Sequence, residues 1–336
     1  MTEKQTAEAP VPTTRAVEAA PANPSGSTGS PGSSAGLLFG IGAYGLWGLL
    51  PLYFVTLVPA GPVEIVADRV LFSLVVCFVL LTVARSWRAF GAVLRSGRAF
   101  GALALAAALI GVNWLTYTFG VLNGQAIEAS LGYFINPIVS VLLGVLVLKE
   151  RLRPLQWTAV AIGAVAVLVL SVAYGQVPWI ALILAFSFGF YGLVKNRVGA
   201  TVDAVTSLTV ETVVLTPAAL GVVAWLAAAG TLTLTGHGPG HFWLLAASGV
   251  ITATPLLFFG AAARRLPMTT IGLLQYIAPL SQFLLAVTVL GEHMAAGRWI
   301  GFGIVWLAIL VLTADTLFVA RRRRAGLRAA AESARA

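Results

Sequence analysis

Three ionisable residues lie inside long apolar stretches of the chain, where a charge is costly. Asp68 and Arg69 are adjacent in the stretch 63–84, and Glu211 lies in the stretch 204–229. A charge at the centre of a membrane-spanning helix costs about 2.5 to 3.5 kcal/mol on insertion scales, so each is a candidate functional residue. We expect Arg69 either to hold an anionic ligand group or to pair with Glu211, with Asp68 and Glu211 as proton-carrying acids. The structural alternative is a static ion pair, with Asp68 merely reaching the outer membrane surface.

Polar and aromatic residues also recur in neighbouring apolar stretches and form a candidate binding set. Asn113 and Tyr117 are four residues apart, so they share one face of a helix. Amide side chains can also bond across helices for about 1 kcal/mol, which is the structural alternative for the amides of the set. The full set of candidate binding residues is Trp47, Arg69, Asn113, Trp114, Tyr117, Tyr133, Asn136, Gln275, Tyr276 and Gln282.

The elements that must position these residues are membrane-spanning helices. The chain has 336 residues, of which 59% are hydrophobic and only 10% charged, with a mean hydropathy of +0.92. Because about 20 apolar residues cross a bilayer and lipid offers no partner for backbone groups, such segments are helices. The composition therefore predicts an all-α integral membrane protein with ten transmembrane helices, at 37–58, 63–84, 99–121, 126–148, 155–174, 177–194, 204–229, 242–263, 268–290 and 299–319.

The charge distribution predicts the orientation of these helices. The net charge of +9 comes from short basic clusters between apolar stretches, which indicates contact with membrane lipids and no nucleic-acid partner. The connection after 148 carries Lys149, Arg151 and Arg153, whereas the connection before 299 carries Arg298 alone. Since Lys and Arg favour the cytoplasmic side, both termini are predicted inside, N-in/C-in. The four arginines from 321 to 324 are expected to contact anionic headgroups.

Other ionisable residues predict little chemistry. Glu64 and Glu128 fall near the outer ends of their predicted helices, where we expect them to reach the membrane surface. Asp315 lies near the last basic cluster and is expected to pair with it. A single cysteine, three histidines and the absence of a glycine-rich phosphate-binding motif predict no metal, no cofactor and no use of ATP.

An internal repeat divides the chain into halves. Residues 131–170 align without a gap onto 273–312, matching Pro137 with Pro279, Glu150 with Glu292 and Trp157 with Trp299. A duplicated unit of five helices must reverse its orientation in the second copy, which is typical of membrane proteins with a central site between inverted repeats. We therefore expect a disordered cytoplasmic tail at 1–35, repeats at 36–174 and 175–320, and a basic cytoplasmic tail at 321–336.

Several motifs carry a family resemblance. Each half has a Pro followed by an apolar run and a Glu, at Pro137 to Glu150 and at Pro279 to Glu292. This pattern resembles the EamA type of the drug/metabolite transporter superfamily. The strings 44–48 (Tyr-Gly-Leu-Trp-Gly), 113–114 (Asn-Trp) and 131–137 (Leu-Gly-Tyr-Phe-Ile-Asn-Pro) look like its RarD branch. The resemblance covers roughly 36–320 and implies export or exchange of a small solute, with no catalytic residues.

These observations together predict a secondary transporter of the bacterial inner (cell) membrane. We expect a small metabolite or drug as substrate, alternating access about a midplane cavity, and proton coupling through Asp68 or Glu211 as one possible source of drive. The fifth and tenth helices are expected to be scaffold. The alternative is an integral membrane enzyme or lipid-modifying protein, but such enzymes cluster His, Asp or Cys near one interface, and here the acids are scattered.

Overall fold

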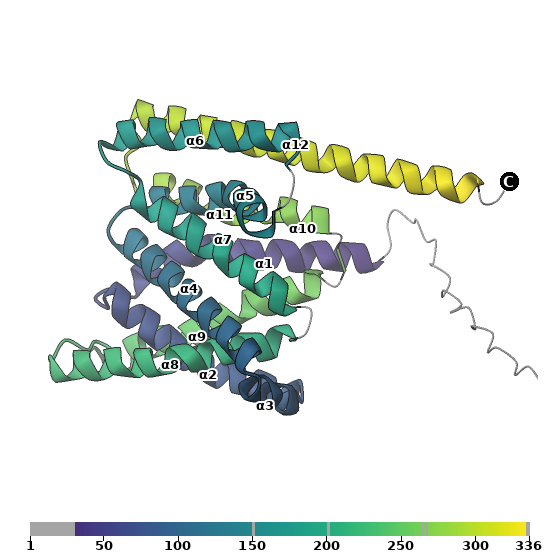
Figure 1. Ribbon diagram of the computed structural model, residues 1–336. Helices are drawn as coiled ribbons and strands as arrows, with labels where there is room; N and C mark the ends of the chain where they lie inside the picture. The colour runs from purple at the N-terminus through teal and green to yellow at the C-terminus, as the bar shows by residue number, and fades with distance from the viewer. Residues whose placement is uncertain (1–30, 150–151, 200–201, 264, 267, 334–336) are drawn as a thin grey trace, which may run out of the picture.

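The computed structural model describes residues 31–149, 152–199, 202–263, 265–266 and 268–333, and these ranges contain helices and their connections without a strand. Most of the predicted N-terminal tail (1–30) lies outside the described residues. So do Glu150, which was matched with Glu292 in the repeat, and Arg151 of the basic connection. The helices are α1 (Pro31–Thr56), α2 (Pro62–Val83), α3 (Trp87–Arg95), α4 (Gly97–Leu122), α5 (Ala126–Leu148), α6 (Pro154–Tyr174), α7 (Trp179–Gly199), α8 (Ala204–Ala228), α9 (Gly238–Ala263), α10 (Met268–Leu274), α11 (Ile277–Thr288) and α12 (Ala296–Ser333) (Figure 1).

Apolar segments of membrane-spanning length account for most of the fold. Within the described ranges, nine segments are long and apolar enough to cross a bilayer. Each corresponds to one predicted segment. The remaining predicted segment, 177–194, coincides with the shorter apolar helix Trp179–Lys195 at the start of α7. The all-helical membrane fold is thus confirmed, and the tenth crossing stays a prediction.

Local sequence signals explain where several helices begin and end. Pro62 and Pro154 are the first residues of α2 and α6. At this position a backbone N–H would have no acceptor within the helix, so its absence in proline costs nothing. The Asp203 carboxylate accepts a hydrogen bond from the Thr206 backbone N–H at 3.0 Å, which caps α8. Gly175 ends α6 with φ of 68°, a left-handed conformation that glycine adopts without strain.

Three elements differ from the predicted segments. The short helix α3 lies between α2 and α4. The stretch 268–290 is two helices, α10 and α11, separated at Gln275 and Tyr276. Pro279 has no N–H to donate to the Gln275 carbonyl four residues earlier, and this weakens the helix at that point. Finally, α12 continues as helix to Ser333, through the arginines that were predicted to begin a separate tail.

The helices pack mainly across the two predicted halves. The helix α1 contacts α9 and α11, while α7 contacts α4 and α5. The pair α2 and α8 and the pair α6 and α12 also lie in contact. In Figure 1, α6 and α12 run together along one edge of the bundle, and α12 extends beyond the other helices on the side where α1 begins.

Close backbone approach fixes the pair α2 and α9. A Cβ atom placed on Gly249 of α9 would lie 2.6 Å from the Phe72 carbonyl carbon and oxygen of α2. Only glycine permits this separation, which brings side chains of both helices together one turn away. The outward faces of the bundle are apolar, with Val172 84% and Val83 77% exposed, as expected for a surface that meets lipid.

Candidate functional site

Arg69 lies buried where four helices meet. Its Nε donates a hydrogen bond to Thr252 Oγ1 of α9 at 2.7 Å. The guanidinium carbon lies 4.2 Å from the centre of the Trp114 ring of α4 and 5.9 Å from that of Phe54 in α1. The side chain is only 4% exposed. Arg69 is therefore held by one neutral hydrogen bond and by aromatic faces, an arrangement that leaves its positive charge available.

The predicted pair of Arg69 with Glu211 is wrong. The Glu211 carboxylate instead lies 2.6 Å from Lys195 Nζ of α7. It also accepts hydrogen bonds from the Tyr191 hydroxyl at 3.1 Å and from the Ser207 hydroxyl at 3.0 Å. Lys195 Nζ additionally donates to Ser207 Oγ. Because Lys195 falls just after the predicted apolar segment 177–194, sequence reasoning did not count it among the charges inside helices and missed this ion pair.

Asp68 is fully buried, so the structural alternative, in which it merely reaches the outer membrane surface, is also wrong. Its exposure is 0%, and neither carboxylate oxygen has a hydrogen-bond partner within the described ranges. Glu64 lies one helical turn before Asp68 in α2. Its carboxylate accepts hydrogen bonds from the Thr233 and Leu234 backbone N–H groups at 2.6 and 2.9 Å. An ionised Asp68 would lack compensation, so its protonated form is favoured in this conformation.

Asparagine and tyrosine side chains of the predicted set contact one another next to Arg69 and Trp114. Asn113 Nδ2 donates to Ser187 Oγ at 3.0 Å and to the Leu184 carbonyl at 3.1 Å, both in α7. The Tyr133 hydroxyl of α5 donates to Asn113 Oδ1 at 2.9 Å. The Tyr117 ring lies 5.6 Å from that of Tyr133. The structure thus brings Arg69, Asn113, Trp114, Tyr117 and Tyr133 into one continuous group, which we call the arginine cluster together with Phe54 and Thr252.

Other predicted site residues lie outside the arginine cluster. Gln282 Nε2 of α11 donates to the Trp47 carbonyl of α1 at 3.0 Å. The Trp47 ring packs on Tyr44, with ring centres 5.4 Å apart. Gln275 and Tyr276 occupy the break between α10 and α11. Asn136 is half-buried, and its Oδ1 has no hydrogen-bond partner among the described residues. These residues lie on α1, α5, α11 and the break before α11.

Sequence reasoning missed Phe54, Thr252, Tyr191 and Lys195. Phe54 and Thr252 carry no charge and differ in no visible way from other residues of apolar helices. Lys195 had a usable signal, because it lies four residues after Tyr191 and so shares a helix face with it.

Glu64 and Glu128 are buried and accept hydrogen bonds from the backbone of other segments, which corrects the expectation that they reach the membrane surface. Glu128 accepts hydrogen bonds from the Ile180 N–H at 2.9 Å and from the Ala181 N–H at 3.5 Å, at the start of α7. Glu292 in turn accepts from Ala126 N–H at 2.6 Å and Ile127 N–H at 2.9 Å, at the start of α5. Burial raises the pKa of Glu292, although these two hydrogen bonds lower it in part. The carboxylates thus accept hydrogen bonds from backbone N–H groups at helix N-termini, which have no acceptor within their own helix.

Asp315 also has a different partner from the one expected. Its carboxylate lies 2.6 Å from Arg153 Nη2, which joins α12 to the start of α6. The predicted pairing was with the arginines that follow it in the chain. This contact fixes the two helices that run along one edge of the bundle.

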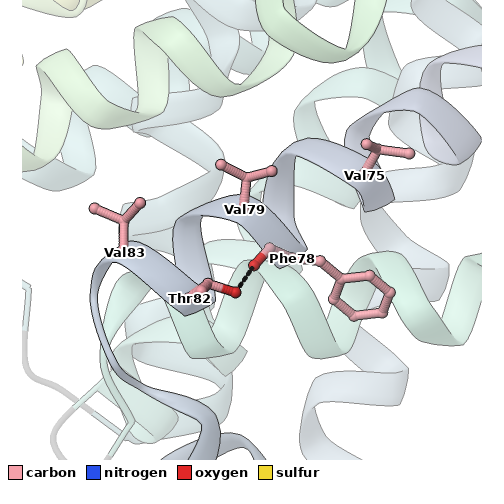
Figure 2. Close-up of a pocket in the computed structure, with 5 residues that line it drawn as sticks. All are labelled: Val75, Phe78, Val79, Thr82 and Val83. Carbon is pink, nitrogen blue, oxygen red and sulfur yellow. Dashed lines mark hydrogen bonds between the residues drawn. The ribbon is translucent and has the colours of Figure 1, made fainter.

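One pocket on the protein lies away from all of these residues. Figure 2 shows its lining residues on a single helix, α2: Val75, Phe78, Val79, Thr82 and Val83. The Thr82 hydroxyl donates to the Phe78 carbonyl at 2.8 Å and is thereby satisfied. Since Val75, Val79 and Val83 are all more than half exposed, this apolar hollow faces the lipid. It supplies no polar group for binding and is not the candidate site.

Comparison with known proteins gives the family. The model of the EamA-like transporter family matches residues 34–172 and again 177–314. Protein RarD of Streptomyces exfoliatus is 52% identical over 88% of this chain and 93% of its own length. An uncharacterized transporter of Vibrio cholerae is 42% identical over 86% of this chain and 96% of its own. Protein RarD of Escherichia coli K12 is 40% identical over 85% of this chain and 96% of its own.

A solved structure described only as "Crystal structure of protein" shares the fold, with a TM-score of 0.53 at 19% identity. It covers 84% of this chain and 98% of its own. The sequence relatives and the two family matches extend over the helices that carry the arginine cluster. The chain belongs to the EamA-like transporter family, in the branch that contains the RarD proteins, and is a multi-pass membrane transporter.

Proposed function

We propose that the protein is a secondary transporter that exports or exchanges small metabolites or drugs across the bacterial inner membrane by alternating access. The proposal includes ten crossings with both termini inside and two inverted five-helix repeats at 36–174 and 175–320. It assigns no enzymatic activity, cofactor or metal to the chain.

The packing between the halves is the observation that carries this proposal. If the repeats correspond in order, α1 matches α7, α2 matches α8, α4 matches α9, and α5 matches the broken helix α10 and α11. Three main contacts between halves then have inverted counterparts: α1 on α9 with α7 on α4, α1 on α11 with α7 on α5, and α2 on α9 with α8 on α4. Two equivalent sets of contacts permit one half to tilt against the other in two related conformations.

The position of the buried charges supports a central site. Arg69 and Asp68 of the first half lie in α2, next to Thr252 of α9 and near α8 of the second half. A site at the contact of two halves is exposed to one side or the other as the halves tilt. The pair α6 and α12, which contacts the remaining helices less, is proposed as scaffold.

Metabolite profiling of cells and medium tests this function. Cells overexpressing the unaltered chain are expected to redistribute one or a few solutes between compartments, and cells expressing Arg69→Ala are expected not to. Arg88→Ala is the matched control, because Arg88 is exposed and lies on α3, which carries no residue of the arginine cluster. New chemical species in the membrane fraction, without any redistribution, would instead favour an enzyme.

A further inference from the structure

We propose that the arginine cluster binds a small organic monoanion, with its carboxylate on Arg69 and its apolar body against the surrounding rings. This inference rests on the proposed function for its biological meaning and deepens it by naming the substrate class. The sequence alone left open whether Arg69 binds a ligand or an acidic side chain of the protein.

Arg69 has no acidic partner among the residues that the structure describes. Glu211 is paired with Lys195, and Glu64 is occupied by the Thr233 and Leu234 backbone. Asp68, the preceding residue in the chain, forms neither an ion pair nor a hydrogen bond with any described residue. A cation buried among helices of a membrane protein without a counter-charge is costly. An anionic ligand supplies that counter-charge.

The guanidinium is held in a way that leaves donors free for a carboxylate. Thr252 accepts from Nε, and the guanidinium carbon lies over the Trp114 ring. The terminal nitrogens Nη1 and Nη2 donate to no described side chain or carbonyl. A carboxylate matches two parallel N–H groups of arginine in a bidentate pair, which is among the stronger hydrogen-bonded contacts in proteins.

Tyr117 supplies an independent indication of a ligand. Its side chain is 3% exposed, yet its hydroxyl oxygen has no hydrogen-bond partner in the described ranges. Its ring lies 5.9 Å from that of Phe54, which in turn lies beneath Arg69. Because buried hydroxyls are nearly always hydrogen-bonded, this donor points to an acceptor that a carboxylate can provide.

The surroundings set the rest of the substrate class. Phe54, Trp114, Tyr117 and Tyr133 present aromatic surface around a single available positive charge. One charge neutralises a monoanion, whereas a dianion would bring a second, unpaired charge into the helix bundle. A cation would be repelled by Arg69. An aromatic or otherwise apolar carboxylate fits both the charge and the rings.

Binding to the purified full-length chain in detergent tests this inference without any transport step. The probes are benzoate, its uncharged analogue benzamide, its cationic analogue benzylamine, and acetate, which has the charge without the ring. The measurement is the midpoint of thermal unfolding against probe concentration. Benzoate is expected to raise the midpoint progressively, acetate much less, and benzamide and benzylamine not at all.

Variants locate the binding. Arg69→Gln is expected to abolish the benzoate shift, while the exposed control Arg88→Gln retains it. Tyr117→Phe preserves the ring and removes only the hydroxyl, so it keeps the proposal testable should Arg69→Gln fail to fold. It is expected to weaken benzoate binding about tenfold, the loss of one hydrogen bond to a charged group.

A benzoate shift equal to that of benzamide, or unchanged in Arg69→Gln, would overturn the inference, as would the absence of any benzoate shift. None of these results touches the transport proposal, because a neutral or cationic solute can still be redistributed in the profiling experiment. Conversely, benzoate binding without solute redistribution would retain the anion site and remove the transport function.

Discussion

Lys195 Nζ lies 2.6 Å from the Glu211 carboxylate, although sequence reasoning had linked Glu211 to Arg69. Glu211 is almost fully buried, whereas the Lys195 side chain retains 27% exposure. Removing one partner of a buried ion pair leaves the other charge uncompensated, at a cost of about 3 kcal/mol or more, while removing both costs less. The pair therefore contributes mainly to holding α7 against α8.

The first prediction concerns this pair. Glu211→Gln and Lys195→Met alone are each expected to lower the thermal midpoint of the purified protein. The double variant is expected to recover part of that loss. If the two single effects simply added in the double variant, the charges would not be coupled.

Asp68 is expected to carry the coupling proton, because Glu211 is committed to Lys195. The acids Glu64 of α2 and Glu211 of α8 are already engaged, Glu64 by the Thr233 backbone N–H and Glu211 by Lys195. In inverted vesicles, Asp68→Asn should lose uptake driven by a proton gradient while retaining exchange of the profiled solute. Cys77→Ser, on the same helix, is the control. Gradient-driven uptake that survives in Asp68→Asn would remove the residue from coupling.

Glu292 gives a prediction about pH. Its folded-state pKa is raised above the ordinary value of 4.5, mainly by burial. A carboxyl group with a raised folded pKa binds its proton more tightly when folded, so its contribution to stability is greatest at low pH. That contribution declines as the pH rises from about 4.5 through the raised pKa, and then stays constant.

Thermal midpoints measured between pH 4 and pH 8 therefore should fall more for the unaltered chain than for Glu292→Gln, which cannot ionise. Glu292→Ala is expected to be about 1 to 2 kcal/mol less stable than Glu292→Gln at every pH, because it also loses the one side-chain oxygen that Gln keeps as an acceptor for the Ala126 or Ile127 N–H. Parallel profiles for the unaltered chain and Glu292→Gln would contradict the assignment.

Gly249 is predicted to be intolerant of a side chain. Gly249→Ala would set a methyl group 2.6 Å from the Phe72 carbonyl and should cost about 1 to 3 kcal/mol, by separating α2 from α9. The matched control is Gly221→Ala in α8, where a Cβ meets nothing within 4 Å. Gly221→Ala should be neutral or stabilising. The comparison requires only thermal midpoints, and equal effects of both substitutions would contradict the close approach.

The proposed orientation predicts opposite accessibility at two exposed positions. In a Cys77→Ser background, His293→Cys should react with an impermeant thiol reagent applied to intact cells. Arg88→Cys should react only after the membrane is opened. Both side chains are exposed, so burial does not confuse the comparison. The reverse pattern would place the termini outside.

The fold could be predicted from sequence because lipid imposes one simple rule on every segment. The lengths of the apolar segments and the turn residues between them were enough to predict where nearly all of the described helices lie. The short helix α3 is too polar for that rule, and the break before Ile277 depends on a carbonyl that Pro279 leaves without a partner. Apolar periodicity contains no information about either feature.

The site was predicted only in part. Asp68 and Arg69 were selected because a charge inside a membrane-spanning helix is costly, and both side chains are buried. The partners of the charges could not be predicted, because they depend on which helices touch. The cost of an uncompensated charge in an apolar helix suggested a pair of Arg69 with Glu211, whereas the helix contacts bring Glu211 toward Lys195 of α7. Asparagine and tyrosine contacts across α4, α5 and α7 required the same knowledge.

The exchange of partners between halves has a consequence for how the chain is made. The first helix, α1, packs chiefly on α9 and α11, which are synthesised some two hundred residues later. Tyr53 likewise donates its hydroxyl hydrogen bond to the Leu244 carbonyl, 191 positions along the chain. During synthesis, α1 must therefore wait in the bilayer with its inward face covered by lipid or by an insertion factor. A nascent chain that stops at the end of α6 would thus be a substrate for membrane quality control and not a stable half-transporter.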